Sequence, residues 1–547
     1  MPDATPPRSA DLPEDPATLK AMVREQAFEI ERLKEELRLA AHKRFGASSE
    51  KADPAQPELF NEVELLASKP APPGEGDEIT VPAHKRAKGG RKPLDDRLAR
   101  ERIEHDIPEH EKLCPCGSGH LRPRIGEVVT EQADIVPAQI KVLQHVRFKY
   151  GPCKVCDGVF LPTGNLLAPC DSASRSRPQG APNVAEPRAI ILAPLPPQPI
   201  PKSLAAPGLA AWIAMSKYGD GLPLYRQEGI LARYGLIISR ATLAHWMIRL
   251  SELVVPVINL LEEVQLGYDV LQMDETTIQV LKENGRAAQT DSRMWVRRGG
   301  PPDKPVVLFD YDASRSGKVA WRLTEDFKGY LQSDGFSGYD AVGKRDGIDH
   351  VGCLAHARRK FDEALKAQPV ENRGGLAIEG VTLIQRIYRI EKAAREAGLT
   401  PEQRKELRDK HARPIWAELR SWLDEKRGHA PPQMLIGKAM TYLDNQWPQL
   451  IRVLDDGRLE VDNNRCENAL RPFVVGRKAW LFSDTPAGAT ASARLYGLVE
   501  TAKANNCEPY AYLRRVFTDL PKATKLAQIE TLLPWNVAAT ATQSVAA

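Results

Sequence analysis

A narrow apolar seam between residues 19 and 40 is the first pattern along the chain. Positions spaced alternately by four and three residues are occupied by Leu19, Val23, Gln26, Ile30, Leu33, Leu37 and Ala40. This spacing is typical of the a and d positions of heptads and predicts a helix between Pro16 and Gly46. So narrow a seam favours a coiled coil, although a helix packed on its own domain stays open. Gln26 would weaken the seam while fixing its register.

Three helical patterns follow a proline-rich connector, at residues 209–218, 224–234 and 239–250. Gly235 lies in the short turn before the third pattern, and Ser239 is a suitable N-cap. Two helices joined by a short glycine-containing turn are typical of a helix-turn-helix, whose second helix enters a DNA major groove. Arg240 and His245 are then candidates to face DNA, whereas Leu243 and Trp246 belong to a core. An ordinary α-hairpin is the alternative.

Short strand patterns alternate with helices and loops beyond residue 268, which predicts an α/β domain. The predicted strands are 269–273, 294–298, 305–311, 329–333 and 350–353. Residues 357–455 have an almost wholly helical pattern, and a further helix begins near Glu467, capped by Asp462 or Asn463. Because far more residues separate the last predicted strand from this helix than one connection needs, the helical block is an insertion.

Two aspartates end predicted strands, and a glutamate lies in the helix after the insertion. Asp274 follows the first strand, Asp334 follows the fourth, and Glu467 lies far downstream. Three carboxylates brought together offer the hard oxygen ligands that Mg²⁺ prefers. Two such ions can hold the attacking and leaving oxygens of a phosphodiester. Arg471 lies one helical turn beyond Glu467 and so on the same face.

Other acids compete for this role, and other basic residues accompany it. Asp310 and Asp312 also end a strand, Asp340 follows Asp334 closely, and Glu275 would face away from Asp274 in a continued strand. The basic candidates for phosphate contacts are Arg471, Arg477, Lys478 and His356. Guanidinium groups suit phosphate, but pairing with neighbouring acids, or a structural role for His356, is the alternative.

Composition adds a few limits. The chain has 547 residues, 42% of them hydrophobic, and a formal charge of +4, so we expect several domains and no dominant basic character. Residues 85–92 form a basic run that suits either a nucleic-acid patch or a solvated linker. No stretch reaches the roughly 18 apolar residues of a membrane helix. With no signal-peptide pattern either, we expect a cytoplasmic protein.

Two close cysteine pairs predict a small metal-binding domain. Cys114 and Cys116 precede a strand-like stretch, and Cys153 and Cys156 follow it. Four thiolates would hold a structural Zn²⁺, with His120 as an alternative ligand to Cys114. Free thiols are the other possibility, since the first pair is spaced more tightly than usual.

Taken together in this order, these segments resemble the large transposases of the insertion-sequence-sixty-six family, which use two aspartates and a glutamate as catalytic residues. The resemblance covers nearly the whole chain. The matching segments are the apolar seam, 42–51, the cysteine pairs, 199–203, 217–218, 222–226, 273–276, 333–339, 352–361, 462–467, 471–472, 476–478, 505–513 and 533–536.

The resemblance implies a ribonuclease-H-like catalytic core with an all-helical insertion, in which Asp274, Asp334 and Glu467 bind two Mg²⁺ or Mn²⁺ ions. It also implies cleavage of element ends and their joining to target DNA, with double-stranded DNA, a second copy of the chain and small accessory proteins as partners. In the cell, such a protein would associate with the bacterial nucleoid when bound to DNA. The expected divisions are a coiled coil (16–46), a linker (47–100), a zinc-binding domain (101–165), a connector (166–203), a helical DNA-binding region (204–265), the catalytic domain (266–500, insertion 357–455) and a C-terminal segment (501–547).

Two other functions fit the same residues. A DNA-binding regulator with an inactive catalytic domain would bind element ends without cutting them. A nuclease for RNA–DNA hybrids would share the carboxylate chemistry but differ in substrate.

Overall fold

The computed structural model describes residues 15–45, 140–147, 149–150, 191–192, 195–369 and 373–538. The predicted linker, the five candidate zinc ligands and most of the proline-rich connector lie outside these ranges. A short antiparallel pair, β1 (Lys149–Tyr150) and β2 (Ile191–Leu192), flanks the undescribed stretch 151–190, whose sequence contains Cys153 and Cys156.

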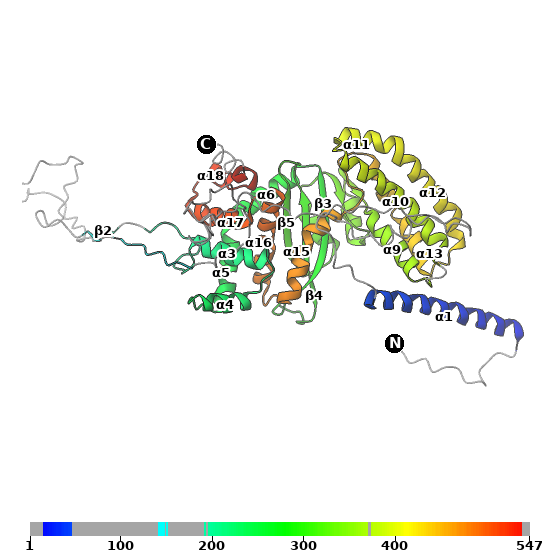
Figure 1. The fold of residues 1–547 in the computed structure, drawn as a ribbon, viewed down its shortest axis with the longest axis horizontal. Helices are drawn as coiled ribbons and strands as arrows, with labels where there is room; N and C mark the ends of the chain where they lie inside the picture. The colour runs from blue at the N-terminus through cyan, green and yellow to red at the C-terminus, as the bar shows by residue number, and fades with distance from the viewer. Residues whose placement is uncertain are drawn as a thin grey trace, which may run out of the picture. The chain divides into compact units, whose positions relative to one another are not determined.

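One mixed five-stranded sheet positions both candidate aspartates. Its strands are β3 (Val270–Gln279), β4 (Asp291–Gly299), β5 (Val306–Asp312), β6 (Gly329–Gln332) and β7 (Ile348–Val351). Asp274 lies within β3 and Asp334 just beyond β6. Figure 1 labels the strands β3, β4 and β5. The order is β5-β4-β3-β6-β7, with β3, β4 and β5 antiparallel and β6 and β7 parallel to β3. All five predicted strands are therefore confirmed.

The first of these strands is longer than its sequence pattern indicated. β3 continues past Asp274 to Gln279, and its second half pairs with β4 from Val296 to Asp291. Thr276, Thr277 and Ile278 are β-branched and suit an extended strand. The expectation that Asp274 ends a strand is thus wrong, because Asp274 lies in mid-strand.

The sheet buries a different apolar layer on each face. On one face Leu271, Met273 and Trp295 pack with α7 (Gly317–Leu323) and α8 (Asp340–Gly343). On the other, Ile278, Met294 and Val296 join a larger core with α15 (Asn464–Trp480) and α16 (Pro486–Ala504). Because side chains alternate along a strand, Asp274 shares the second face with Ile278.

Helix α16 covers the β5 side of the sheet. Its Thr501 hydroxyl donates to the Val307 carbonyl at 2.8 Å and accepts the Val307 N–H at 3.0 Å. These bonds satisfy backbone groups of β5 that no further strand pairs. The expected division at residue 500 lies inside this helix, so the core and the C-terminal segment share a continuous element. Helices α17 (Pro509–Asp519) and α18 (Leu526–Glu530) follow.

The helical region before the sheet matches its sequence pattern. It consists of α3 (Pro207–Tyr218), α4 (Leu224–Arg233), α5 (Arg240–Leu253) and α6 (Val255–Leu266). Ser239 is the N-cap of α5 and accepts the Thr242 N–H, as predicted. Gly235 has φ +83° in the turn between α4 and α5, where a side chain would be strained. Leu243 and Trp246 are buried core residues, also as predicted.

The predicted insertion is helical. It contains α9 (Leu354–Lys366), α10 (Gly375–Glu396), α11 (Pro401–Leu407), a π-helical turn (Arg408–Ala412), α12 (Arg413–Lys426), α13 (Leu435–Asn445) and α14 (Trp447–Leu450). These helices enclose an apolar core of their own, which includes Phe361, Ile384 and Trp416. The insertion is therefore a separate packing unit that follows β7 directly.

Helix α1 (Pro16–Phe45) confirms the first predicted element as a helix. Val23 and Leu37 of its seam are 63% and 70% exposed, so the seam has no partner within the described residues. A neighbouring face of α1 contacts the insertion, where Arg38 donates to the Ala367 carbonyl at 2.6 Å. The coiled coil stays a prediction.

Among the described helices, none alone has the length and apolar character needed to cross a membrane. The bent pair α5 and α6 reaches that threshold only when the two helices are counted together.

Candidate active site

The register of the parallel strands brings the two predicted aspartates together. Val270 pairs with Tyr330 and Gln272 with Gln332, a constant offset of 60 residues. The same offset separates Asp274 from Asp334, which lies two residues beyond the end of β6. Although formal pairing of β3 with β6 stops at Gln332, the Ser333 N–H still bonds to the Val351 carbonyl of β7. Asp334 therefore leaves the sheet beside Asp274.

The third carboxylate comes from the first turn of α15, which is attached to β3. Asn463, the residue before the helix, donates its side-chain amide to the Met273 carbonyl at 2.8 Å. Asn463 is also the N-cap residue of α15, and the Asp462 carboxylate before it accepts the Asn464 N–H at 3.1 Å. Because Met273 directly precedes Asp274, this anchor places Glu467 close to the aspartates.

Burial and mutual repulsion dominate the electrostatics of these acids. Burial raises the pKa of Asp274 well above its ordinary value, and the charges of Glu275, Glu467 and Asp334 raise it further. Burial also raises the pKa of Asp334, against the Phe336 N–H, Arg315 and Arg359, which lower it. Within the described residues, neither aspartate forms an ion pair. Partly buried anions that form no ion pair and repel each other are costly, so the pair suits a bound cation.

The donor set fits a hard divalent cation. Each aspartate uses one oxygen locally: Asp274 accepts the Glu275 N–H at 2.8 Å and Asp334 the Phe336 N–H at 3.0 Å. The remaining carboxylate oxygens, with one from Glu467, are the kind of ligands that Mg²⁺ and Mn²⁺ take.

Glu467 also lies next to the first helix of the insertion. Its Oε1 is 3.9 Å from His356 Nδ1, and its Oε2 is 3.8 Å from the Arg359 guanidinium. Burial lowers the pKa of His356, and the charge of Arg359 lowers it further against the opposing effect of Glu467. The insertion thus contributes directly to the surroundings of the candidate metal ligands.

The competing acids are engaged elsewhere. Glu275 faces away from Asp274, where it accepts the Tyr339 hydroxyl at 2.7 Å and pairs with Arg315 at 2.6 Å. Asp310 pairs with the buried Arg297 at 3.0 Å. Asp312 pairs with Arg322. Asp340 is the first residue of α8.

The predicted basic residues divide into bound and free side chains. Arg477 donates to both Thr276 and Thr277 and so fastens α15 to β3. Arg471 and Lys478 are exposed on α15, and Arg240 is exposed at the start of α5. These three form no ion pair within the described residues. Arg477 is thus a structural residue, while the other three are available to a ligand.

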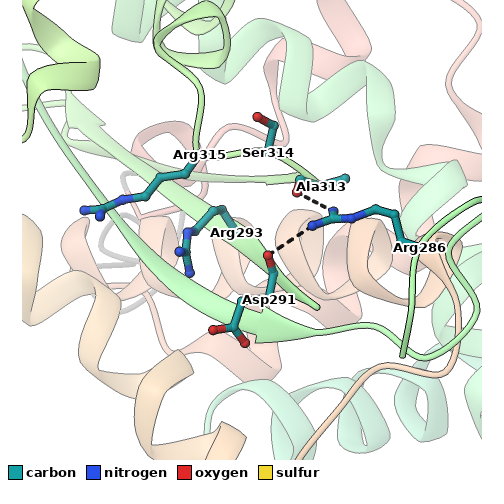
Figure 2. A pocket seen from close by; sticks show the side chains of 6 residues that line it. All are labelled: Arg286, Asp291, Arg293, Ala313, Ser314 and Arg315. Carbon is teal, nitrogen blue, oxygen red and sulfur yellow. Dashed lines mark hydrogen bonds between the residues drawn. The ribbon is translucent and has the colours of Figure 1, made fainter. Parts of the chain in front are cut away.

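An arginine-lined cavity near the sheet escaped the sequence patterns. Its volume is about 420 Å³, and Figure 2 shows Arg286, Arg293 and Arg315 around it. Arg286 is held by the Asp291 and Ala313 carbonyls, whereas Arg315 reaches Glu275 beside the acidic site. These arginines come from separate loops and strands, so no local spacing in the sequence connected them.

Comparison with known proteins decides the family. Residues 202–491, more than half of the chain, match the family model described as "Transposase IS66 family". The chain belongs to the IS66 transposase family. The match spans the helical region, the sheet, the insertion and α15.

Three further models of the IS66 transposases match other segments. The C-terminal element of IS66 matches residues 497–535, and the zinc-finger binding domain of transposase IS66 matches residues 111–157. Residues 32–103 match a model described as "Transposase C of IS166 homeodomain". The IS66 zinc-finger match covers all four predicted cysteine ligands and supports structural zinc there.

Relatives of this IS66 family chain include three uncharacterized proteins of Sinorhizobium fredii (strain NBRC 101917 / NGR234). One, y4jD, is 30% identical over 79% of each chain. A second, y4qI, is 31% identical over 80% of this chain and 76% of its own. A third, y4hP, is 26% identical over 93% of this chain and 88% of its own. The similarity therefore extends over most of the chain.

Proposed function

We propose that this chain is a metal-dependent DNA transposase in which Asp274, Asp334 and Glu467 are the catalytic carboxylates. The observation that carries the proposal is the convergence of these three acids, from β3, the end of β6 and α15, in a protein of a transposase family. Two of them, Asp274 and Asp334, are half-buried and form no ion pair among the described residues. The predicted activity is cleavage at the ends of the element and joining of those ends to target DNA.

The sheet supports a ribonuclease-H-like core. Three antiparallel strands followed by two parallel ones, with β3 in the centre, bring the first and second acids to adjacent strands. The third acid arrives from a helix after the insertion. This arrangement is the one that the sequence resemblance implied.

In the proposed reaction, the metal ions and the protein side chains have different roles. Bound there, two Mg²⁺ ions would lower the pKa of the attacking water and stabilise the leaving 3′ oxygen. Asp274 is held by the sheet on one side and α15 on the other, so its carboxylate needs little reorganisation. Arg359 beside Glu467 can hold a phosphate oxygen, since guanidinium groups bind phosphate well. The freed 3′-hydroxyl would then attack target DNA in the same site.

Double-stranded DNA would contact two surfaces. Arg471 and Lys478 lie on the helix that carries Glu467, where they would hold phosphates near the cut. His356 begins the insertion beside the same acid. Arg240, at the first turn of the second helix in the helix-turn-helix-like pair, would enter a groove. The exposed seam of α1 supports a dimer, and zinc would stabilise the cysteine domain.

The deciding experiment uses duplexes carrying the ends of the element that encodes this chain. We expect nicking only with Mg²⁺ or Mn²⁺, followed by joining of the free 3′ end to a second duplex. Binding without nicking in either metal would favour the regulator, and preferential cutting of an RNA–DNA hybrid would favour the nuclease.

Substituting the free basic residues tests the DNA path along α15. Arg471→Ala and Lys478→Ala should each weaken binding of the end duplex. Each should also reduce the slope of log affinity against log salt by about 0.9, the value for one lost phosphate contact. Fluorescence anisotropy over a salt series measures both. Lys522→Ala is the control, because this lysine lies outside α15, just after α17, and pairs with Asp519 at 3.1 Å. An unchanged slope in both α15 variants would show that Arg471 and Lys478 do not contact DNA phosphates.

A further inference from the structure

Three side chains of different chemistry converge beside the acidic pair. The Cys353 thiol, the His356 imidazole and the Glu467 carboxylate each place a donor atom within 4.8 Å of the others. Cys353 follows β7, His356 lies in the first turn of α9, and Glu467 lies in the first turn of α15. The cluster therefore joins the sheet, the insertion and the helix of the third acid.

The thiol is placed as a sulfur acceptor. Cys353 Sγ accepts the Asn463 N–H at 3.2 Å, and the His356 N–H also bonds to it. Burial and the charges of Asp462 and Glu467 raise the pKa of this thiol against the two backbone donors, so the sulfur is a neutral thiol until a cation binds. The two N–H groups then support the thiolate of a metal-bound cysteine. Asn463 is also the residue that anchors α15 to β3, so the same segment fixes both sites.

The other two donors lack partners. His356 Nδ1 and Glu467 Oε1 are both buried atoms without a hydrogen bond. At 3.9 Å they are too far apart to bond to each other. Buried polar atoms are nearly always satisfied, so two facing unsatisfied ones require an explanation. An ion between them and the sulfur would satisfy both.

The mixture of donors selects the kind of ion. Mg²⁺ takes oxygen ligands, whereas sulfur, nitrogen and oxygen together suit Zn²⁺. We propose that Cys353, His356 and Glu467 form a binding site for one Zn²⁺-class transition-metal ion, which shares Glu467 with the Mg²⁺ ligand set but does not use Asp274 or Asp334. His356 and Glu467 are each about one quarter exposed, so water can complete a tetrahedral shell.

This ion would connect the insertion to the third acid. It uses Glu467 Oε1, while Oε2 stays on the side of Arg359. The bound ion would then hold the start of α9, through His356, against the start of α15, through Glu467. The inference shares Glu467 with the proposed function but does not depend on DNA cleavage.

Cobalt binding to the full-length protein tests the site, because Co²⁺ replaces Zn²⁺ and its thiolate complexes absorb in the near ultraviolet. Protein first loaded with Zn²⁺ in the cysteine domain is titrated with Co²⁺ in excess Mg²⁺. We expect one further Co²⁺ per chain with a thiolate-to-cobalt band. Cys353→Ser should abolish the band, and His356→Ala should weaken Co²⁺ binding at least about 10-fold, the lower end for loss of a supporting group around a metal.

Cys466→Ala is the matched control. Cys466 is also a buried thiol and precedes Glu467 in the sequence, but it does not belong to the cluster. It should keep the band. A band that persists in Cys353→Ser, or no further Co²⁺ in the wild type, overturns the inference. His356→Ala provides an independent variant if Cys353→Ser fails to fold. If the protein shows the cobalt band but never cuts DNA, the proposed function is contradicted and this inference stands. If the protein cuts DNA but shows no cobalt band, this inference is contradicted and the proposed function stands.

Discussion

Replacing Asp274 with asparagine should reduce Mg²⁺-dependent cleavage of element ends at least about 1,000-fold. The half-buried carboxylate lies in mid-strand in β3, on the face that packs against α15, and is one of the three proposed ion ligands. Loss of one preorganised electrostatic group in an active site typically costs 100- to 1,000-fold, and loss of a metal ligand also weakens ion binding. Asp334→Asn and Glu467→Gln should have effects of the same order. Denaturing gels of end-labelled duplex measure the cut strand.

The same variants should bind the end duplex as tightly as the wild type, because none of them removes a positive charge. Asp274→Asn should also be at least as stable as the wild type at neutral pH. It removes a buried charge that lacks an ion pair, provided that no divalent metal is present. Asp312→Asn is the control on the same sheet, since Asp312 pairs with the half-exposed Arg322. Full cleavage by any of the three variants removes that residue from the catalytic set, and lost cleavage in the control makes the effect nonspecific.

The elements of the fold could be predicted because their signals are local. Alternating apolar residues marked all five strands, and the Gly235 turn with the Ser239 cap marked the helix pair. The pattern misplaced the end of β3, because Thr276 and Thr277 are polar and conceal a strand that continues. Their hydroxyls face Arg477, a partner 200 residues away that no local window contains.

The candidate site could be predicted only in part. Asp274 and Asp334 were found because each follows an apolar run and the family order supplied Glu467. The surroundings of Glu467 depended on how the insertion returns to the sheet, which placed Arg359 beside the acid. Cys353 and His356 lie close in sequence, but the third donor, Glu467, lies on another helix, so no local spacing connects the three. Arg477 donates hydrogen bonds to β3, a partner that depends on tertiary packing, and its contact with DNA stays a prediction.

The insertion fixes the approach to α15 through a buried ionic network. Glu391 of α10 accepts hydrogen bonds from Arg404 and Arg408, and all three are almost fully buried. Arg408 also donates to the carbonyls of Val453 and Leu459, in the segment that leads to α15. Arg404 holds Glu460, whose carbonyl accepts the side-chain amide of Gln332 on β6 at 2.7 Å.

Glu391→Gln should therefore lower the free energy of unfolding by about 3–5 kcal/mol, the usual cost of leaving a buried charge without its partner. Cleavage should fall as well, because the segment before Glu467 loses its anchor. Urea unfolding followed by circular dichroism measures the first effect. Glu418→Gln is the control: it breaks an exposed pair with Arg386 and should cost at most about 1 kcal/mol. Equal losses in the two variants would show that the network contributes no more than a surface pair.

The same network predicts how stability depends on pH. Burial alone would raise the pKa of Glu460, but the hydrogen bond from Arg404 and the charges of Arg465, Arg404 and Arg408 outweigh it and lower the pKa from 4.5 to about 2. A carboxyl whose pKa is lower in the folded state stabilises the protein above its unfolded pKa. That contribution is lost as the pH falls from about 4.5 to 2. Wild-type protein should lose stability across this range, and Glu460→Gln should be less stable at neutral pH but lose less on acidification. A parallel decline in both proteins would assign the acid sensitivity to other carboxylates.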